Sequence, residues 1–191
     1  MNDISPFREP HDFYPTPPEA TRALLSVESF HGPIWEPACG DGAIAKILLA
    51  AGHSVVSTDL IDRGWGTSGI NFLTEPHNRA RHIITNPPYG RGLADSFIRK
   101  ALALARPVSG DVAMLLDLAG LCHPIRTSFY LSNPPAAIYA MDDLTFLPGG
   151  RIGSTPVKSR FCWMVWRAAH KGRPSFWWLP MARFRTSMGA S

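Results

Sequence analysis

A short apolar stretch that ends in two prolines places the strongest constraint on how this chain can fold. Ile83, Ile84 and Thr85 are β-branched residues, which favour a buried strand, and Asn86-Pro87-Pro88-Tyr89 follows them at once. Proline cannot donate to a strand ladder and keeps the residue before it out of the helical region, so the strand must stop at Asn86. Asn86 is therefore held at the carboxyl end of a strand, where open α/β sheets bind their ligands.

The four residues after this strand offer a site for a planar group that carries an NH2. The Asn86 carboxamide and the carbonyls of Asn86 and Pro87 are rigidly placed acceptors, and Tyr89 supplies a flat apolar face beside them. We therefore predict that Asn86, Pro87, Pro88 and Tyr89 are the catalytic residues. The simpler alternative is that Asn-Pro-Pro forms an ordinary turn and that Tyr89 lies at its rim.

A glycine turn near the start of the chain indicates a nucleotide site. The sequence predicts a strand over 34–38, a tight turn at Cys39-Gly40-Asp41-Gly42, a helix over 43–51 and a strand over 53–58 that ends in Asp59. This order is the mononucleotide-binding half of a doubly wound fold. Glycines let backbone N–H groups approach a ligand closely, and an acid after the second strand can accept from ribose hydroxyls.

The rest of the chain continues this alternation of helices and strands. Thr16 is expected to cap a helix that runs to about Phe30, with Glu19 completing a capping box. Hydrophobic patterns predict helices over 93–106 and 125–131, and strands over 70–73, 81–86, 112–118, 136–141 with its continuation 144–147, and 161–166, which should pair with the strand before it. We expect an irregular segment over 1–15, a single domain over 16–167, and a basic, aromatic tail over 168–191.

Composition narrows the class of protein. The chain is 45% hydrophobic and 18% charged, which is globular, and it has no uncharged apolar run of about 18 residues to cross a membrane. The stretch 1–18 is polar and proline-rich, which argues against secretion. Because Cys39, Cys122 and Cys162 form no CxxC or Cys/His cluster, we expect reduced thiols, no zinc or other metal site, and a cytoplasmic protein.

Positive charge gathers at one end of the chain. None of the 15 acidic residues lies beyond Asp143, whereas 8 of the 19 basic residues do. Such asymmetry is typical of a polyanion-binding face, and the aromatic residues interleaved with these charges favour base stacking. We expect nucleic-acid contacts from Arg151, Lys158 and Arg160 in the loop 148–159 and beside it. The alternative is a flexible hairpin end followed by a solubility tail.

Taken together, these motifs resemble the class I S-adenosylmethionine-dependent methyltransferases, and within them the small phage-like amino-methyltransferases that act on the exocyclic N6 of adenine in DNA. The resemblance covers about residues 12–167 and rests on the stretches 36–42 (EPACGDG) and 86–89 (NPPY). It implies a Rossmann-like α/β fold with a mostly parallel seven-stranded sheet, an antiparallel last strand and helices on both faces.

The resemblance also implies where S-adenosylmethionine binds. In the family the glycine turn wraps the methionine part, the acid that matches Asp59 holds the ribose, and a segment like Tyr14-Pro15-Thr16-Pro17 closes over the cofactor. Where the family has an acid and an aromatic after strand three, this chain departs from it with Asn71-Phe72, although Asn71 can still hydrogen-bond an adenine edge. The expected cofactor-binding residues are Tyr14, Thr16, Glu36, Pro37, Ala38, Cys39, Gly40, Asp59, Leu60, Asn71, Phe72 and Asn86.

The resemblance leaves several classes of molecule that could accept the methyl group. The NPPY tetrapeptide also serves methyltransferases of ribosomal or transfer RNA bases and of protein glutamine. The glutamine enzymes carry a helical N-terminal recognition domain for which the residues before the first strand leave no room, and the form of the glycine turn favours DNA over RNA. A non-catalytic cofactor-binding protein is the remaining alternative. Because no separate recognition domain is expected, sequence specificity should be low or borrowed from a partner.

Overall fold

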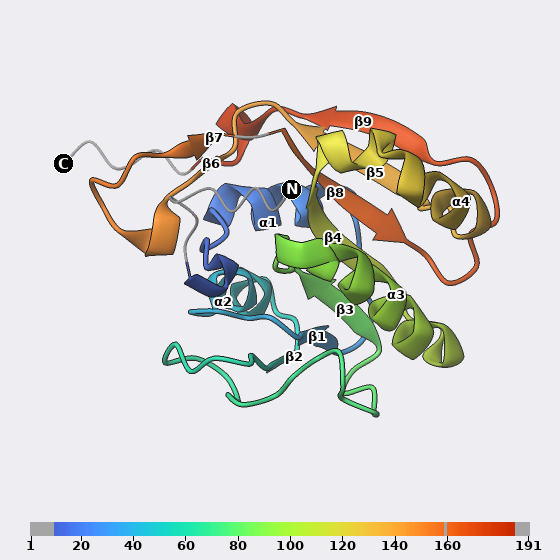
Figure 1. The fold of residues 1–191 in the computed structure, drawn as a ribbon, viewed down its shortest axis with the longest axis horizontal. Helices are drawn as coiled ribbons and strands as arrows, with labels where there is room; N and C mark the ends of the chain where they lie inside the picture. Colours follow the sequence, from blue (N-terminus) through green and yellow to red (C-terminus); the bar gives the residue numbers. More distant parts are fainter. Residues whose placement is uncertain (1–9, 159, 186–191) are drawn as a thin grey trace.

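A seven-stranded sheet with helices on both faces forms the body of the molecule (Figure 1). The structure, a computed structural model, describes residues 10–158 and 160–185. The strands lie in the spatial order β2 (Val55–Ser57), β1 (Ile34–Glu36), β3 (His82–Thr85), β4 (Val112–Asp117), β8 (Phe161–Trp166), β5 (Ala137–Met141) and β9 (Ser175–Leu179). Within this sheet β8 runs antiparallel to β4 and β5, and the other pairs are parallel. The expected mostly parallel sheet with one antiparallel strand is confirmed.

Among the described residues, four α-helices connect and cover the strands. They are α1 (Pro18–Val27), α2 (Ala43–Ala50), α3 (Leu93–Ala105) and α4 (Pro124–Ser132). Short 3-10 turns link them: η1 (Pro10–Asp12), η2 (Gly90–Gly92), η3 (Arg106–Val108), η4 (Leu118–Cys122), η5 (Pro148–Gly150) and η6 (Met181–Arg183). In the described part of the chain, no helix is long and apolar enough to cross a membrane.

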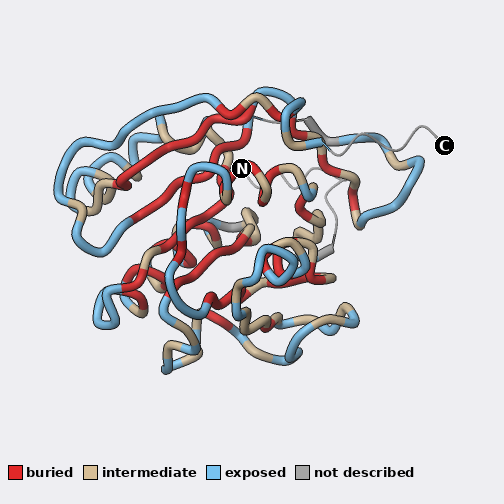
Figure 2. The backbone as a smooth tube through the Cα atoms, turned by 180° about the vertical axis from the view of Figure 1, so that it is seen from behind, coloured by how far each residue is buried: buried red, intermediate tan, exposed pale blue. Residues whose placement is uncertain are grey.

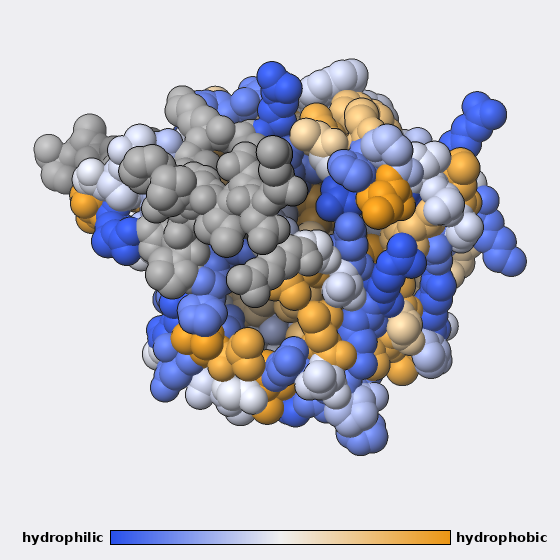
Figure 3. All heavy atoms as spheres, in the orientation of Figure 1, coloured by the Kyte–Doolittle hydropathy of each residue, from blue (hydrophilic) through white to orange (hydrophobic). Residues whose placement is uncertain are grey.

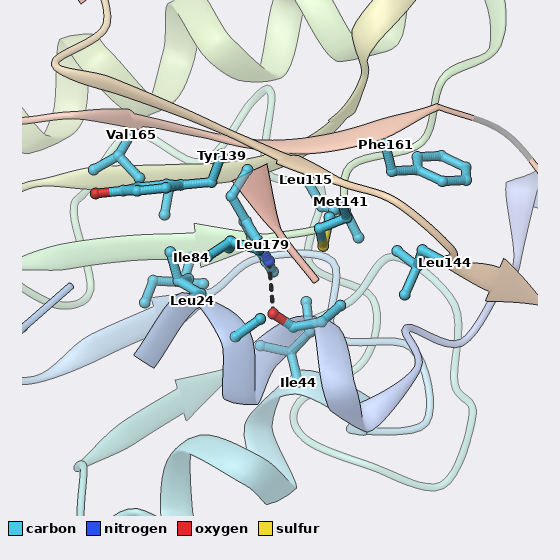
Figure 4. Close-up of a cluster of buried hydrophobic side chains, with 14 of the residues drawn as sticks. Leu24, Ile44, Ile84, Leu115, Tyr139, Met141, Leu144, Phe161, Val165 and Leu179 are labelled. Carbon is cyan, nitrogen blue, oxygen red and sulfur yellow. Dashed lines mark hydrogen bonds between the residues drawn. The ribbon is translucent and has the colours of Figure 1, made fainter. Parts of the chain in front are cut away.

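The sheet has one apolar core on each face. On one face, α1 and α2 pack against inward side chains of the strands, and the indole Nε1 of Trp163 donates to the carbonyl of Ala20 at 2.8 Å (dashed line in Figure 4). On the other face, α3 packs over Trp35, Ile83 and Met114. Figure 2 shows the central strands as an almost continuous buried layer, because both of their faces are covered.

Several aromatic residues near the end of the chain belong to this core. Phe161, Trp163 and Trp166 are buried in β8, so they cannot form an exposed stacking surface for a nucleic acid. In contrast, Phe176 and Trp178 in β9 are 43% and 73% exposed. The interleaving of charge and aromatic residues in the sequence therefore mixes two kinds of residue that the fold separates.

Two expected elements differ in the structure. Residues 70–73 form no strand; the stretch runs through turns, and the carbonyl of Asn71 accepts from the backbone N–H groups of Thr74 and Glu75. The seventh strand is instead β9, which lies within the expected tail 168–191 and pairs in parallel with β5. Residues 175–179 therefore extend the sheet. The last residues of that tail, 186–191, lie outside the described residues, as does most of the expected irregular segment 1–15.

Two local expectations are also corrected. The residue before α1 is Pro17, and no side chain caps this helix, so the predicted Thr16 capping box is wrong. Thr16 is buried and its hydroxyl is used elsewhere, as described below. Residues 144–147 do not continue β5; β6 (Thr145–Phe146) pairs instead with β7 (Val157–Lys158) in a separate two-stranded hairpin.

Candidate active site

Two cavities open at the carboxyl ends of the parallel strands and meet at Asn86. The first has a volume of about 270 Å³ and the second about 390 Å³, and Tyr14 and Asn86 line both. Parallel strands align their carboxyl ends at one edge, so β1, β3 and β4 bring their following loops together there. In Figure 3 the surface is hollowed in the lower centre, with apolar atoms at the rim.

The first cavity gathers the residues that the sequence assigned to the cofactor. All twelve of them line it: Tyr14, Thr16, Glu36, Pro37, Ala38, Cys39, Gly40, Asp59, Leu60, Asn71, Phe72 and Asn86. They come from the segment before α1, the turn after β1, the end of β2, the loop 60–73 and the end of β3. The placement of Phe72 differs from the expectation in one respect, because the ring is 2% exposed and packs edge-on against Trp35 with centroids 5.1 Å apart.

Asp59 ties the glycine turn to the end of β2. One carboxylate oxygen accepts from the Gly40 N–H and the other from the Ile61 N–H, both at 2.8 Å. Gly40 and Gly42 have φ values of +56° and +81°, and a Cβ on Gly42 would lie 2.4 Å from the Trp65 ring, so this turn requires glycine. Asp59 therefore shapes the cavity wall even before any role toward a ligand.

Two buried carboxyl oxygens on the first cavity lack a hydrogen-bond partner among the described residues. They are Oε2 of Glu36 and Oδ1 of Asp41. Burial raises the pKa of the Glu36 carboxyl well above its usual value; a backbone hydrogen bond from Ala45 opposes this, and the charges of Asp41 and Asp59 add to it. Buried polar atoms are normally paired, so these oxygens suit a ligand that brings a donor or a positive charge.

Cys39, in contrast, is an inert wall residue. Burial, with the nearby Glu36 and Asp59 charges, raises the pKa of its thiol to about 12, so the thiol stays protonated. Its Sγ lies 3.6 Å from the carbonyl of Trp65. Within residues 10–158 and 160–185, no group of three or more His, Cys, Asp or Glu side chains is placed to hold a metal ion.

Asn86 is held in one orientation by residues from the start of the chain. Its Nδ2 lies 3.1 Å from Oγ1 of Thr16 and 3.4 Å from the carbonyl of Tyr14, which can only accept. Its Oδ1 is therefore the acceptor end, and the Tyr89 hydroxyl lies 2.8 Å from it. This explains why Thr16 is buried although it does not cap α1.

The neighbours of Asn86 divide between the two cavities. Pro88 lines the first cavity and Tyr89 the second, whereas Pro87 is buried. The Tyr89 hydroxyl also lies 2.8 Å from the carbonyl of Leu115, and burial raises the pKa of this phenol well above its usual value. Tyr89 is thus pinned at its hydroxyl and presents its ring as a wall of the second cavity.

The second cavity combines aromatic walls with charged groups. Phe146 and Phe161 pack together with ring centroids 4.6 Å apart, and the Tyr89 ring lies 6.4 Å from Phe161. The charged lining is Asp117 at the end of β4 and the ion pair of Arg126 with Asp95, 2.7 Å apart. Of these five residues, the sequence pointed only to Phe161, as one of the aromatic residues interleaved with basic ones; the other four come from elements that meet only in the folded sheet.

The segment 10–16 lies across the opening and was only partly anticipated. Asp12 accepts from the Gly90 N–H at 2.7 Å, and the carbonyl of Phe13 accepts from the Gly149 N–H at 3.1 Å. The Arg63 guanidinium stacks 3.9 Å from the centroid of the Phe13 ring. His11 and Asp12 adopt left-handed φ values of 56° and 55°, which are uncommon for residues other than glycine. Through these contacts, the segment 10–16 connects the loops that surround both cavities.

The predicted nucleic-acid residues lie beside this opening rather than in it. Arg151 and Arg160 are exposed, and Lys158 belongs to β7, although its side chain lies outside the described part of the structure. Arg160 immediately precedes Phe161, and its carbonyl accepts from the Leu118 N–H at 2.6 Å. The β6–β7 hairpin projects from the same end of the molecule as the segment 10–16 (Figure 1).

Comparison with known proteins identifies the fold but no close relative. The sequence matches no family model and no curated protein. Among solved structures, a candidate class I S-adenosylmethionine-dependent methyltransferase from Listeria monocytogenes superposes with a TM-score of 0.61 at 14% identity, covering 90% of this chain and 67% of that one. A candidate RNA methyltransferase from Pyrococcus horikoshii gives 0.62 at 14% identity, covering 84% and 90%.

A third similar structure is longer than this chain. It is the modification subunit of a candidate type I restriction enzyme from Vibrio vulnificus, with a TM-score of 0.57, 15% identity and 87% of this chain covered. The match spans 47% of that subunit, about half its length. At these identities the likeness establishes the fold, which is the Rossmann-like fold of the class I methyltransferases.

Proposed function

We propose that this protein transfers a methyl group from S-adenosylmethionine to an exocyclic amine of a nucleic-acid base, with adenine N6 in DNA as the favoured acceptor. The observation that carries this proposal is the meeting of two cavities at Asn86. A cofactor in the first cavity and a base in the second would face each other across the Asn86 carboxamide. Methyl transfer requires this arrangement, because the nucleophile must approach the methyl carbon in line.

The first cavity fits S-adenosylmethionine in its chemistry. The unpartnered oxygens of Glu36 and Asp41 suit the cationic amino-acid end, and Asp59 lies at the strand end where a ribose would be held. Ile44, Phe72 and Phe97 supply apolar walls for an adenine ring. When bound, the cofactor supplies an electrophilic methyl group; no metal is needed for the transfer.

The residues of this chain then have to activate the acceptor amine. The lone pair of an aromatic amine is delocalised into its ring, so the amine is a weak nucleophile. Oδ1 of Asn86, fixed by Thr16 and Tyr14, would accept a hydrogen bond from one amine N–H, and the Pro87 carbonyl would accept a hydrogen bond from the other. Preorganised acceptors of this kind stabilise charge that develops in the transition state. The ring of Tyr89 would stack on a base that has left its duplex.

Two features support a nucleic-acid base as the methyl acceptor: the lining of the second cavity and the basic residues beside its opening. Its aromatic walls suit a planar base, and the basic residues beside the opening suit phosphates. An RNA base is the alternative acceptor, and two of the similar structures are described as acting on RNA or as belonging to a restriction enzyme. Protein glutamine and a non-catalytic role remain as further outcomes of the test.

Transfer of a radiolabelled methyl group tests the proposal. The protein is incubated with labelled S-adenosylmethionine and, separately, with single-stranded DNA, duplex DNA, RNA and a glutamine-containing protein. We expect label in DNA that resists protease and is lost on nuclease digestion. Label in RNA alone would move the function to the alternative acceptor. Cofactor binding without transfer to any polymer would indicate a non-catalytic protein.

Cofactor binding should release a proton from Glu36. The raised pKa keeps part of the buried carboxyl protonated in the free protein, and a cationic ligand beside it favours the carboxylate. Affinity should therefore increase as the pH rises toward that raised pKa and then level off. Calorimetry in buffers of different ionisation enthalpy, below about pH 7 where the ligand's α-amino group stays protonated, measures the proton release.

Two controls isolate Glu36 in this experiment. Glu36→Gln should bind with an affinity that no longer depends on pH in this range, because the amide does not titrate. Methylthioadenosine, which lacks the charged amino-acid end, should release no proton when it binds the wild-type protein. An equal proton release in Glu36→Gln would assign the titration to another group.

The salt dependence of nucleic-acid binding should report on the residues beside the opening. Each phosphate contact adds about 0.7–0.9 to the slope of log affinity against log salt. Arg151→Ala with Arg160→Ala should flatten the slope by up to about two such increments. The matched control is Arg79→Ala with Arg81→Ala, which removes two charges just before β3, at the opposite end of the strands from Asn86. An equal change in the salt slope of both double variants would mean that Arg151 and Arg160 have no specific role in binding.

A further inference from the structure

The edge of the sheet formed by β9 carries exposed aromatic residues that the proposed transfer reaction does not use. The β9 strand occupies the end of the strand order, beside β5. Its residues Phe176, Trp177 and Trp178 are 43%, 62% and 73% exposed, and Figure 2 shows this strand as a pale margin beside the buried central layer. Large aromatic side chains with this exposure on an edge strand are typical of an interaction surface.

The register of the sheet places two of these rings on the face that holds the second cavity. Trp178 pairs with Ala140, Ala140 with Cys162, and Cys162 with Leu116, which lines the second cavity. Residues paired in this way point to the same face. Three strand spacings separate Trp178 from Leu116, about 14 Å. A single-stranded nucleic acid would span this separation with a few nucleotides, passing outside the buried Ala140 and Cys162.

Phe176 and Trp178 form one aromatic unit, and Trp177 does not belong to it. The rings of Phe176 and Trp178 are in edge contact, with centroids 5.1 Å apart and planes at 74°. Because side chains alternate along a strand, Trp177 points to the opposite face, as does its neighbour Leu179, which belongs to the core under α1. Two tryptophans of similar exposure are thus presented on opposite faces of one strand.

The charges around β9 fit a polyanion. Lys171 and Arg173 precede the strand, Arg183 follows it, and all three are exposed. The acidic residues nearest in the chain are engaged: Asp142 accepts from the Met181 N–H at 2.8 Å, and Asp143 pairs with Arg185 at 2.9 Å. In proteins that bind single-stranded nucleic acid, basic side chains contact the phosphate backbone and exposed aromatic rings stack on the bases.

We infer that Phe176 and Trp178 form a stacking platform for unpaired bases beside the target nucleotide, so that the preferred ligand of this surface is single-stranded nucleic acid. The inference rests on the proposed function, because it assigns the second cavity to a target base. A second copy of the chain is a poorer occupant. Antiparallel pairing of two β9 edges would bring the basic residues that flank the strand in one copy, Arg173 and Arg183, near those of the other copy, and like charges repel.

Paired tryptophan variants test this inference by binding alone. Fluorescence anisotropy of a labelled short single-stranded oligodeoxynucleotide, without cofactor, is compared for wild type, Trp178→Ala and Trp177→Ala. Loss of one stacked base predicts that Trp178→Ala binds about 5- to 150-fold more weakly, whereas Trp177→Ala binds like the wild type. Circular dichroism melting checks that both variants are folded, which their exposure favours.

Other outcomes would overturn the inference. If both variants bind the oligonucleotide as tightly as the wild type, Phe176 and Trp178 do not form a stacking platform. If both bind equally weakly, the effect belongs to the strand edge and not to one face of it. Sedimentation velocity that shows a wild-type dimer disrupted by either substitution would assign the edge to a second copy. The binding assay contains no cofactor and measures no transfer, so a failure of methyl transfer and a failure of the platform are separate results.

Discussion

Asn86→Ala is expected to lower the turnover number for methyl transfer by about 100- to 1,000-fold, the usual cost of removing one preorganised polar group at a reacting centre. The substitution deletes the acceptor whose orientation Thr16 and Tyr14 fix, together with the partner of the Tyr89 hydroxyl. It leaves intact the carboxylates of the first cavity. Cofactor affinity, measured by calorimetry, should therefore change little while single-turnover transfer is nearly lost.

The matched control is Asn71→Ala, which makes the same chemical change at the exposed rim of the first cavity. Oδ1 of Asn71 accepts only a local backbone hydrogen bond from Leu73 at 3.0 Å in this structure. We expect weaker cofactor binding in this variant and near-normal turnover at saturating cofactor. Near-normal turnover in Asn86→Ala would instead mean that the amine is held by another group.

Asp59→Ala is expected to raise the dissociation constant for S-adenosylmethionine by about 100-fold or more. The carboxylate accepts from Gly40 and Ile61, and the proposed ribose contact would add a third charge-assisted hydrogen bond. Hydrogen bonds to charged groups contribute about 1.5–3 kcal/mol each, so losing the ribose contact and loosening the glycine turn accounts for this factor. Calorimetry gives the affinity, and thermal melting confirms that the variant is folded.

Asp62→Ala provides the comparison for this variant. Asp62 lies in the same loop and also accepts from a backbone N–H, that of Gly64 at 2.9 Å, but it is exposed and does not line the cavity. Its removal should leave cofactor affinity nearly unchanged. Should Asp59→Ala bind as tightly as Asp62→Ala, the ribose role of Asp59 would be excluded.

The sequence predicted the parts of the site that depend on local chemistry. The Asn86-Pro87 junction fixes a strand end, and the glycine turn requires left-handed backbone at Gly40 and Gly42 whatever surrounds it. These local constraints, with the resemblance to a known family, brought all twelve expected cofactor residues to one cavity. Binding of the cofactor by these residues remains a prediction.

Features that depend on distant contacts were not predictable in the same way. The apolar run 70–73 has the pattern of a strand, but Phe72 buries its ring against Trp35 from a turn, and burial alone does not distinguish the two. The strand β9 was not predicted because its residues SFWWL show no alternation of apolar and polar side chains, and only Leu179 is turned to the core. Thr16 resembled a helix cap because it stands just before the first turn of α1. Its actual contact is with Asn86, which is far away in the chain, so no local pattern indicates it.

Mass spectrometry of nucleosides tests the central claim most directly. Wild-type protein and Asn86→Ala are each incubated with isotope-labelled S-adenosylmethionine and with DNA or RNA, and the polymers are digested to nucleosides. We expect labelled N6-methyldeoxyadenosine from the wild-type reaction with DNA, and almost none from Asn86→Ala. Label on a ring carbon or on a sugar oxygen, or label that persists in Asn86→Ala, would contradict a transfer to an exocyclic amine held by Asn86.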